Sequence, residues 1–264
     1  MKPLSALLTK PLYKILLGGG ALLSTITYAS AQTSGFFVGA LVGAMAPNNN
    51  FSYSYENAQV WGNENGSWTN SNFISSGNAK QNTFSTNLNY GVRLGYVLAL
   101  NNYNAFRLYG KYSAGQYAIG TDISGAQYQG VQQESFFAHQ LGAGIDYMLS
   151  FSAKSNAWGL FVGGGYEYWL GEVYDNLKNL QSISYETSLN NHFPYVNIGL
   201  TKAFGSGMVS VEIGYRHYFN TMYSGKFDTT SWREQAHSEL RGDIKTDYTA
   251  KPSMSFYAAL NVKF

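Results

Sequence analysis

Histidine and cysteine usage sets the first limits on the chemistry open to this 264-residue chain. The four histidines lie at positions 139, 192, 217 and 237, without the short spacing or the His-Glu-x-x-His sequence of a metal site. The chain has no cysteine, which excludes thiolate metal sites and cysteine nucleophiles. We therefore predict no cofactor, no metal and no enzymatic activity. A lipid-active enzyme that uses His139 or His217, each close to serines, stays as an alternative.

Eight charged residues form the second set with chemical potential, because they occupy alternate positions among small or polar neighbours. Alternate residues of a strand face the same side, so these charges are expected to share one face. If that face lines a narrow closed barrel, the charges must pair with one another, because unpaired buried charges are costly. We predict a structural network of ion pairs in the lumen, with a polar pathway or gate as the alternative. Its predicted members are Arg93, Arg107, Lys111, Asp146, Glu167, Glu212, Arg216 and Lys263.

A repeated alternation of large apolar residues with small or polar ones positions these charges. It is clearest from Leu88 to Leu98, where six large apolar residues alternate with Asn, Gly and Arg. Such period-2 alternation predicts β-strands. The first strand is apolar on both faces, so its register stays open. The eight predicted strands lie near 34–46, 88–98, 105–119, 134–149, 157–170, 192–204, 207–219 and 254–264.

The links between these strands alternate between short and long. Short links lie near 101–104, 150–156 and 205–206, whereas the long links are 47–83, 120–133, 171–191 and 220–250. Short periplasmic turns opposite long external loops are typical of an outer-membrane barrel, and an even strand number puts both termini in the periplasm. The pair Asn65-Gly66 could close a hairpin inside the first long link, so that the strands extend beyond the membrane. Such hairpins could also widen the barrel to ten strands.

Composition and the N-terminal segment agree with export to the outer membrane. Residues 1–31 have lysines, an apolar stretch and Ala29-Ser30-Ala31, which predicts a cleaved signal peptide before a barrel domain at 32–264. Beyond it, no apolar run reaches the length of a membrane helix, so strands are expected to cross the membrane. Charged residues make up only 12% of the chain, while aromatic residues make up 16%. There is no basic run, which argues against nucleic-acid binding.

The aromatic residues are expected to form two girdles at the membrane interfaces. A ligand-stacking cluster inside the barrel is the alternative. The predicted periplasmic girdle is Tyr96, Tyr103, Tyr147, Phe151, Trp158 and Phe204, and the predicted outer girdle is Trp169, Phe193, Tyr195, Tyr215 and Phe219.

Several short segments resemble the Helicobacter outer-membrane protein family. They are Gly-Phe-Phe-Val-Gly at 35–39, Tyr-Gly-Val-Arg-Leu-Gly-Tyr at 90–96 and the terminal Phe264. The chain is similar to the smaller members, which lack the N-terminal passenger region of the adhesins. The last ten residues also resemble a barrel-assembly signal, with aromatic residues at Phe256, Tyr257 and Phe264. The resemblance implies the barrel-assembly machinery, outer-membrane lipids and lipopolysaccharide as partners.

Together these features predict an all-β, antiparallel transmembrane β-barrel in the outer membrane of a Gram-negative bacterium. Its long, Asn-, Ser- and Tyr-rich links would form surface loops, which favours a structural or adhesin-like role with a host-surface ligand. The alternative is a porin-like channel for small solutes. A filled eight-stranded lumen opposes that alternative.

Overall fold

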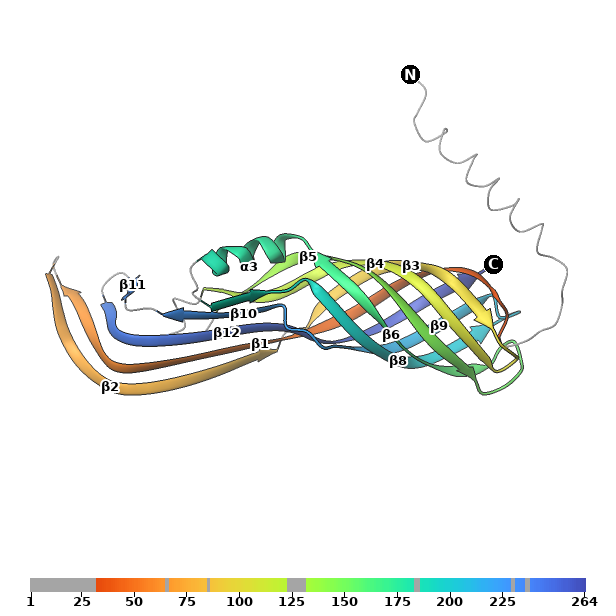
Figure 1. Ribbon diagram of the computed structural model, residues 1–264, viewed down its shortest axis with the longest axis horizontal. Helices are drawn as coiled ribbons and strands as arrows, with labels where there is room; N and C mark the ends of the chain where they lie inside the picture. Colours follow the sequence, from red (N-terminus) through yellow and green to blue (C-terminus); the bar gives the residue numbers. More distant parts are fainter. Residues whose placement is uncertain are drawn as a thin grey trace, which may run out of the picture.

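The described part of the chain forms one elongated, almost entirely β-stranded body (Figure 1). This computed structural model describes residues 32–64, 67–84, 86–122, 132–182, 186–228, 231–235 and 238–264. The predicted signal peptide 1–31, with its cleavage residues Ala29 and Ala31, lies outside the described residues.

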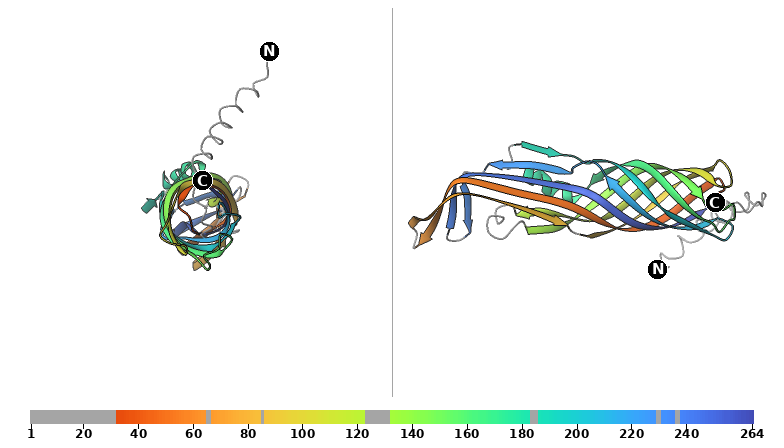
Figure 2. Two further views of the ribbon diagram at one scale, coloured as in Figure 1. Left: turned by 90° about the vertical axis from the view of Figure 1, so that its right-hand side faces the viewer. Right: turned by 90° about the horizontal axis from the view of Figure 1, so that it is seen from below.

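Eight strands close into a ring, which confirms the predicted antiparallel barrel (Figure 2). Each strand pairs with its neighbours in an antiparallel sense, and pairing of the first with the last strand closes the ring from Phe37–Lys263 to Ala46–Met254. The hairpins beyond the barrel do not widen this ring to ten strands. In order, the ring contains β1 (Gly35–Glu64), β3 (Asn87–Ala99), β4 (Asn104–Asp122), β5 (Gln132–Ser150), β6 (Trp158–Leu170), β8 (His192–Phe204), β9 (Val209–Tyr218) and β12 (Ser238–Lys263).

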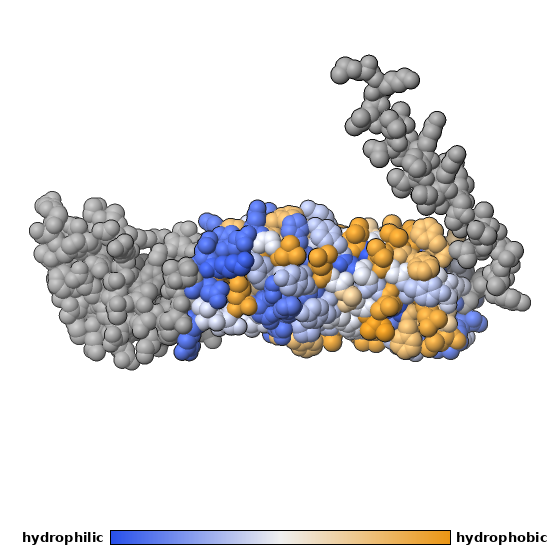
Figure 3. Space-filling model, turned by 45° about the horizontal axis from the view of Figure 1, so that its top comes forward, coloured by the Kyte–Doolittle hydropathy of each residue, from blue (hydrophilic) through white to orange (hydrophobic). Residues whose placement is uncertain are grey.

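The alternating side chains point where the pattern predicts. Large apolar residues of β3, from Leu88 (72% exposed) to Leu98 (51%), lie on the outer surface, while Arg93 between them is buried. The structure also settles the register of the first strand, because Phe36 and Val38 are exposed and Phe37 is buried. Apolar residues therefore cover much of the barrel surface near the short turns (Figure 3). Such a surface requires an apolar solvent, which is the hydrocarbon of a membrane.

Inward-facing glycines make room for long side chains in the narrow lumen. A Cβ atom on Gly165 would lie 2.4 Å from the hydroxyl oxygen of Tyr195, and one on Gly144 would lie 2.6 Å from that of Tyr109. The small residues that alternate with the apolar ones thus determine which large polar side chains the lumen can hold.

The first long link is mostly β-sheet. Pairing of β1 with β12 continues beyond the barrel to Gly62–Ser238, and β2 (Ser67–Phe84) pairs with β1 up to Glu64–Ser67. This register fits the predicted hairpin at Asn65-Gly66, although these two residues lie outside the described part. At about 3.3 Å per residue, segment 47–62 measures roughly 50 Å along the strand, and the extension curves away from the barrel (Figure 1). Strands that extend beyond the barrel agree with the hairpin expected in this link. Their full length was not predicted, because the segment is polar and backbone pairing does not depend on apolar alternation.

Smaller elements occupy the other long links. The strands β10 (Tyr223–Asp228) and β11 (Ser231–Gln235) pair with β12, and β7 (Glu186–Leu189) pairs with β10. A helix that the sequence reading missed, α3 (Glu172–Ser182), follows Gly171, whose φ of +116° only glycine adopts readily. In the described residues, no helix is long and apolar enough to cross a membrane.

Candidate functional site

The lumen contains most of the charged residues predicted to share its face. Seven of the eight are at most 5% exposed and lie inside the ring, from five different strands. Burial at this level requires each charge to have a partner of opposite charge or a hydrogen bond. These seven residues, which we call the lumen network, are Arg93, Arg107, Lys111, Asp146, Glu167, Glu212 and Arg216.

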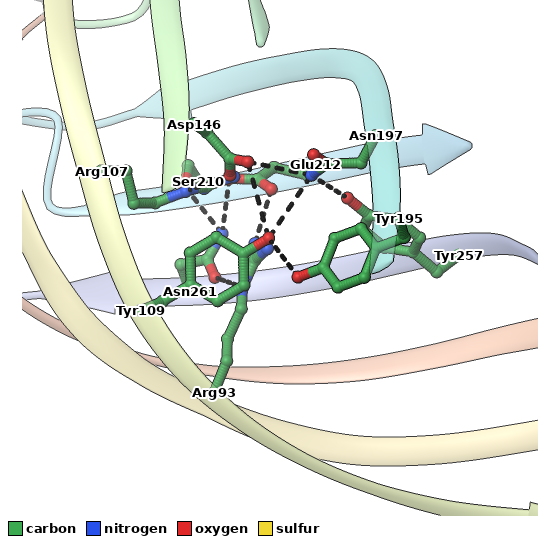
Figure 4. A network of polar contacts seen from close by, with 10 residues as sticks. All are labelled: Arg93, Arg107, Tyr109, Asp146, Tyr195, Asn197, Ser210, Glu212, Tyr257 and Asn261. Atoms are coloured by element: carbon green, nitrogen blue, oxygen red, sulfur yellow. Dashed lines mark hydrogen bonds and ion pairs between the residues drawn. The ribbon is translucent and has the colours of Figure 1, made fainter. Parts of the chain in front are cut away.

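Glu212 is the centre of the first group in the lumen network (Figure 4). Its two carboxylate oxygens accept from different arginines: Oε2 from Nη2 of Arg93 at 2.5 Å, and Oε1 from Nη1 of Arg107. Arg107 also donates from Nη2 to Asp146 Oδ2 at 2.5 Å. Asn261 completes the group, because its amide donates to Glu212 at 3.0 Å while its oxygen accepts from Arg93 at 2.9 Å. One carboxylate therefore joins β3, β4 and β9 across the lumen.

Glu167 is the centre of the second group. It pairs with Lys111 Nζ at 2.5 Å and with Arg216 Nη1 at 3.1 Å. It also accepts from the indole N–H of Trp169 at 3.0 Å and from the hydroxyl of Tyr218 at 3.2 Å. These four contacts replace the hydration that the carboxylate loses on burial.

Tyrosine rings connect the two groups. The hydroxyls of Tyr109 and Tyr195 lie 3.1 Å apart, and the guanidinium of Arg216 lies 4.4 Å from the ring centroid of Tyr195. The lumen network has four cationic and three anionic members, so ring faces and amide oxygens provide the remaining stabilisation of the cations.

An apolar layer fills the lumen on the side of the long hairpins. The ring centroid of Trp169 lies 4.9 Å from that of Phe193 and 5.7 Å from those of Tyr117 and Tyr218. Buried residues of α3 join this layer, including Val173, Tyr174 and Leu177, so the helix packs against the apolar layer. Among the described residues, the lumen is thus filled first by ion pairs and then by aromatic rings.

This layer corrects part of the aromatic prediction. Trp169, Phe193 and Tyr195 are at most 2% exposed and face the lumen instead of forming an outer girdle. The alternation of side chains along a strand explains the error, since Trp169 lies between Tyr168 and Leu170, which both face outward, and must therefore face inward. The predicted periplasmic girdle and Phe219 do lie on the outer surface, and Tyr215 is partly exposed.

Lys263 and the predicted assembly signal lie at the short-turn end. Lys263 faces the lumen as predicted, but it is partly exposed and donates to the backbone oxygen of Thr33 at 3.0 Å, so it lies at the edge of the lumen network. It lines a cavity of about 50 Å³ at the mouth, together with Arg107 and Glu212. Phe256 and Phe264 face outward, whereas Tyr257 is buried beside Arg216. An assembly role for these three aromatic residues stays a prediction.

The histidines proposed for a lipid-active enzyme lie on the outer surface. His139 Nδ1 lies 2.8 Å from the hydroxyl of Tyr112, and His217 Nδ1 lies 3.3 Å from that of Tyr215. Both contacts join a histidine to a tyrosine, and neither forms the Ser–His pair that an activated nucleophile needs. In the described ranges, no group of three or more His, Cys, Asp or Glu is placed to hold a metal ion.

Comparison with known proteins gives structural likenesses only. No protein-family model matches the sequence, and no curated protein matches it. The outer-membrane protein OprG from Pseudomonas aeruginosa is 8% identical with a TM-score of 0.41, over 90% of this chain and 99% of that one. The outer-membrane protease OmpT from Escherichia coli is 8% identical with a TM-score of 0.32, over 91% and 100%. The attachment invasion locus protein Ail of Yersinia pestis is 12% identical with a TM-score of 0.24, over 83% and 99%. Scores this low give no information on activity, so the barrel assignment rests on the strand pairing.

The shared carboxylate of Glu212 predicts a large stability effect. Glu212→Gln leaves Arg93 and Arg107 buried with one carboxylate fewer, and we expect the free energy of unfolding to fall by about 3–5 kcal/mol. Arg93→Gln combined with Glu212→Gln restores the charge balance and should recover much of that loss. The measurement is urea unfolding in lipid vesicles, followed by the fraction of compact protein on unboiled gels.

The exposed pair between Lys226 and Glu186, 2.6 Å apart, provides the matched control. Glu186→Gln should cost less than about 1 kcal/mol, because solvent screens this pair. A Glu212→Gln variant as stable as the wild type, or a double variant less stable than the single one, would contradict a structural role of the lumen network.

Proposed function

We propose that this chain is a non-conducting outer-membrane barrel of a Gram-negative bacterium that presents a long β-sheet at the cell surface for interaction with a host ligand. In this arrangement the short turns and both termini lie in the periplasm, and α3 and the sheet lie outside. The family resemblance of the segments at 35–39 and 90–96 agrees with this location.

The continuous ladder between β1 and β12 is the observation that supports this proposal. It runs from the pair Phe37–Lys263 in the barrel to the pair Gly62–Ser238 at the far end of the projecting sheet, with two register shifts. Two barrel strands thus continue as the core of the projecting sheet, so the sheet is anchored to the barrel by covalent chain and hydrogen bonds. A barrel with a structural role alone has no need of such a projection.

The sequence of the projecting sheet suits a contact surface. Residues 47–84 include seven aromatic and many Asn and Ser residues but only three charged ones, Glu56, Glu64 and Lys80. Tyr, Trp, Ser and Asn dominate binding surfaces because aromatic rings supply contact area at low entropic cost and small polar groups supply hydrogen bonds. The filled lumen, by contrast, gives no support to the porin-like alternative.

The absence of cysteine allows a direct test of the orientation. We expect Ser54→Cys, in the exposed sheet, to react with a membrane-impermeant maleimide on intact cells. Ser206→Cys, in the exposed turn between β8 and β9, should react only after the outer membrane is permeabilised. Equal labelling of both variants on intact cells, or the reverse pattern, would contradict the orientation.

Shortening the sheet tests the proposed surface role. Tyr53 pairs with Ala79, so replacing residues 54–78 by Asn-Gly closes a shorter hairpin and leaves the barrel intact. We expect adhesion of expressing cells to cultured epithelial monolayers to fall to the level of cells without the protein, while the heat-modifiable gel shift is retained.

The control is Asp175→Ala with Lys178→Ala, because both side chains are exposed on α3 and outside the sheet. Adhesion of this variant should match the wild type. Full adhesion by the shortened variant would contradict a binding role for the sheet, whatever the orientation of the barrel.

A further inference from the structure

Three of the four histidines lie on the lipid-facing side of the barrel, and each contacts a tyrosine hydroxyl through Nδ1. His139 lies 2.8 Å from Tyr112, His217 lies 3.3 Å from Tyr215, and His192 contacts Tyr166. The six residues come from β4, β5, β6, β8 and β9, which are consecutive in the ring. We call them the tyrosine–histidine arc.

The histidines of the arc lie toward the hairpin ends of three barrel ladders. His139 pairs with Leu170 at the last position of the β5–β6 ladder on that side. His192 pairs with Tyr168 at the corresponding end of the β6–β8 ladder, and His217 is one position from the end of the β8–β9 ladder. On β6 the exposed apolar residues end at Leu170, which Gly171 and α3 follow directly.

Because the tyrosine contacts use Nδ1 of each imidazole, Nε2 is left to form a hydrogen bond with a group outside the protein. When a tyrosine hydroxyl donates to Nδ1, the proton of a neutral imidazole is on Nε2, which then donates to a group outside the protein. His192 and the three tyrosine rings are partly or largely exposed, so this donor faces the surroundings of the barrel. At the border of the hydrocarbon, the acceptors available are lipid headgroups.

The opposite border of the apolar surface differs in its chemistry. There Tyr147 donates to Asn104, and Lys202 donates to the backbone oxygen of Asn156 while lying 5.4 Å from the ring centroid of Trp158. These polar groups form their hydrogen bonds with other groups of the protein. At the hairpin end, Lys251 lies three residues before Met254, which pairs with His217, so β12 carries a partly exposed cation just beyond the β9–β12 ladder. Imidazole donors and a nearby cation favour an anionic oxygen ligand.

We propose that the tyrosine–histidine arc binds the phosphate groups of the phosphorylated glycolipid in the outer leaflet. This inference rests on the proposed orientation, which puts the arc at the outer border of the membrane. Tyr112, Tyr166 and Tyr215 hold the imidazoles in place, the three Nε2 donors contact phosphate oxygens, and the phenol rings pack against the sugar and acyl-chain region.

Retention of lipid A by folded full-length protein in detergent, measured by native mass spectrometry, tests this site. We compare the wild type with the triple variant His139→Asn, His192→Asn, His217→Asn, and with Tyr147→Phe as the control at the opposite border. The triple variant should retain about tenfold less diphosphorylated lipid A, since three charge-assisted hydrogen bonds are lost. The control should retain as much as the wild type.

A second variant and two further probes distinguish the source of the phosphate and keep the test independent of folding. Tyr112→Phe, Tyr166→Phe, Tyr215→Phe keeps the histidines and should lose about threefold, because the imidazoles are held less firmly. Loss of the phosphates and loss of the histidines should have similar effects: the wild type should retain dephosphorylated lipid A about as weakly as the histidine variant retains diphosphorylated lipid A. In a separate experiment, millimolar inorganic phosphate should not displace lipid A from the wild type.

Equal retention by the wild type and the histidine variant, or equal retention of the dephosphorylated lipid, would overturn the proposal. Displacement by inorganic phosphate would also overturn it, in favour of a site for the free ion. Cysteine labelling on intact cells reports on orientation separately, so a failure of the lipid site is distinguishable from a failure of the proposed function.

Discussion

Closure of eight strands into a ring imposes the constraint on which the rest of this structure depends: whatever lies in the lumen must find its partners there. A ring of this size has an interior just wide enough for side chains to fill. Charges inside it lose most of their hydration, so carboxylates and cations must be arranged in contact. Glu212 and Glu167 meet this requirement by each serving two cations, while inward glycines leave the space that the long side chains need.

The same constraint links the barrel to its surface. Because the lumen is filled by the lumen network and the aromatic layer, function is expected at the ends and outside of the ring. Continuation of β1 and β12 gives the barrel a hydrogen-bonded β-sheet extension, and the tyrosine–histidine arc gives it polar groups on its outer surface. The two features are independent, since one uses backbone pairing and the other uses side chains on the opposite flank of the ring.

Much of the barrel was predictable from the sequence because a membrane imposes strict alternation. Alternation of the kind seen from Leu88 to Leu98 predicted the strand positions, and the charged residues on the opposite faces of these strands included the seven buried members of the lumen network. Prediction failed where another interaction decides the structure. The full length of the sheet at 47–84 depends on backbone pairing without apolar alternation, and α3 depends on its contact with a core assembled from distant strands. The contact of Lys263 with Thr33 depends on the closed ring, which brings the two ends of the barrel domain together. The outward pairing of the histidines with Tyr112, Tyr166 and Tyr215 needed the register between strands, which one sequence does not give.

Ion conductance of the purified full-length protein in a planar lipid bilayer tests the central claim most directly, with heat-modifiable protein from the same preparation as proof of folding. The closed lumen predicts no stepwise current above that of the protein-free bilayer, because ion pairs and aromatic rings occupy the path. Reproducible conductance steps that scale with the amount of folded protein would contradict this account and would favour a porin-like channel.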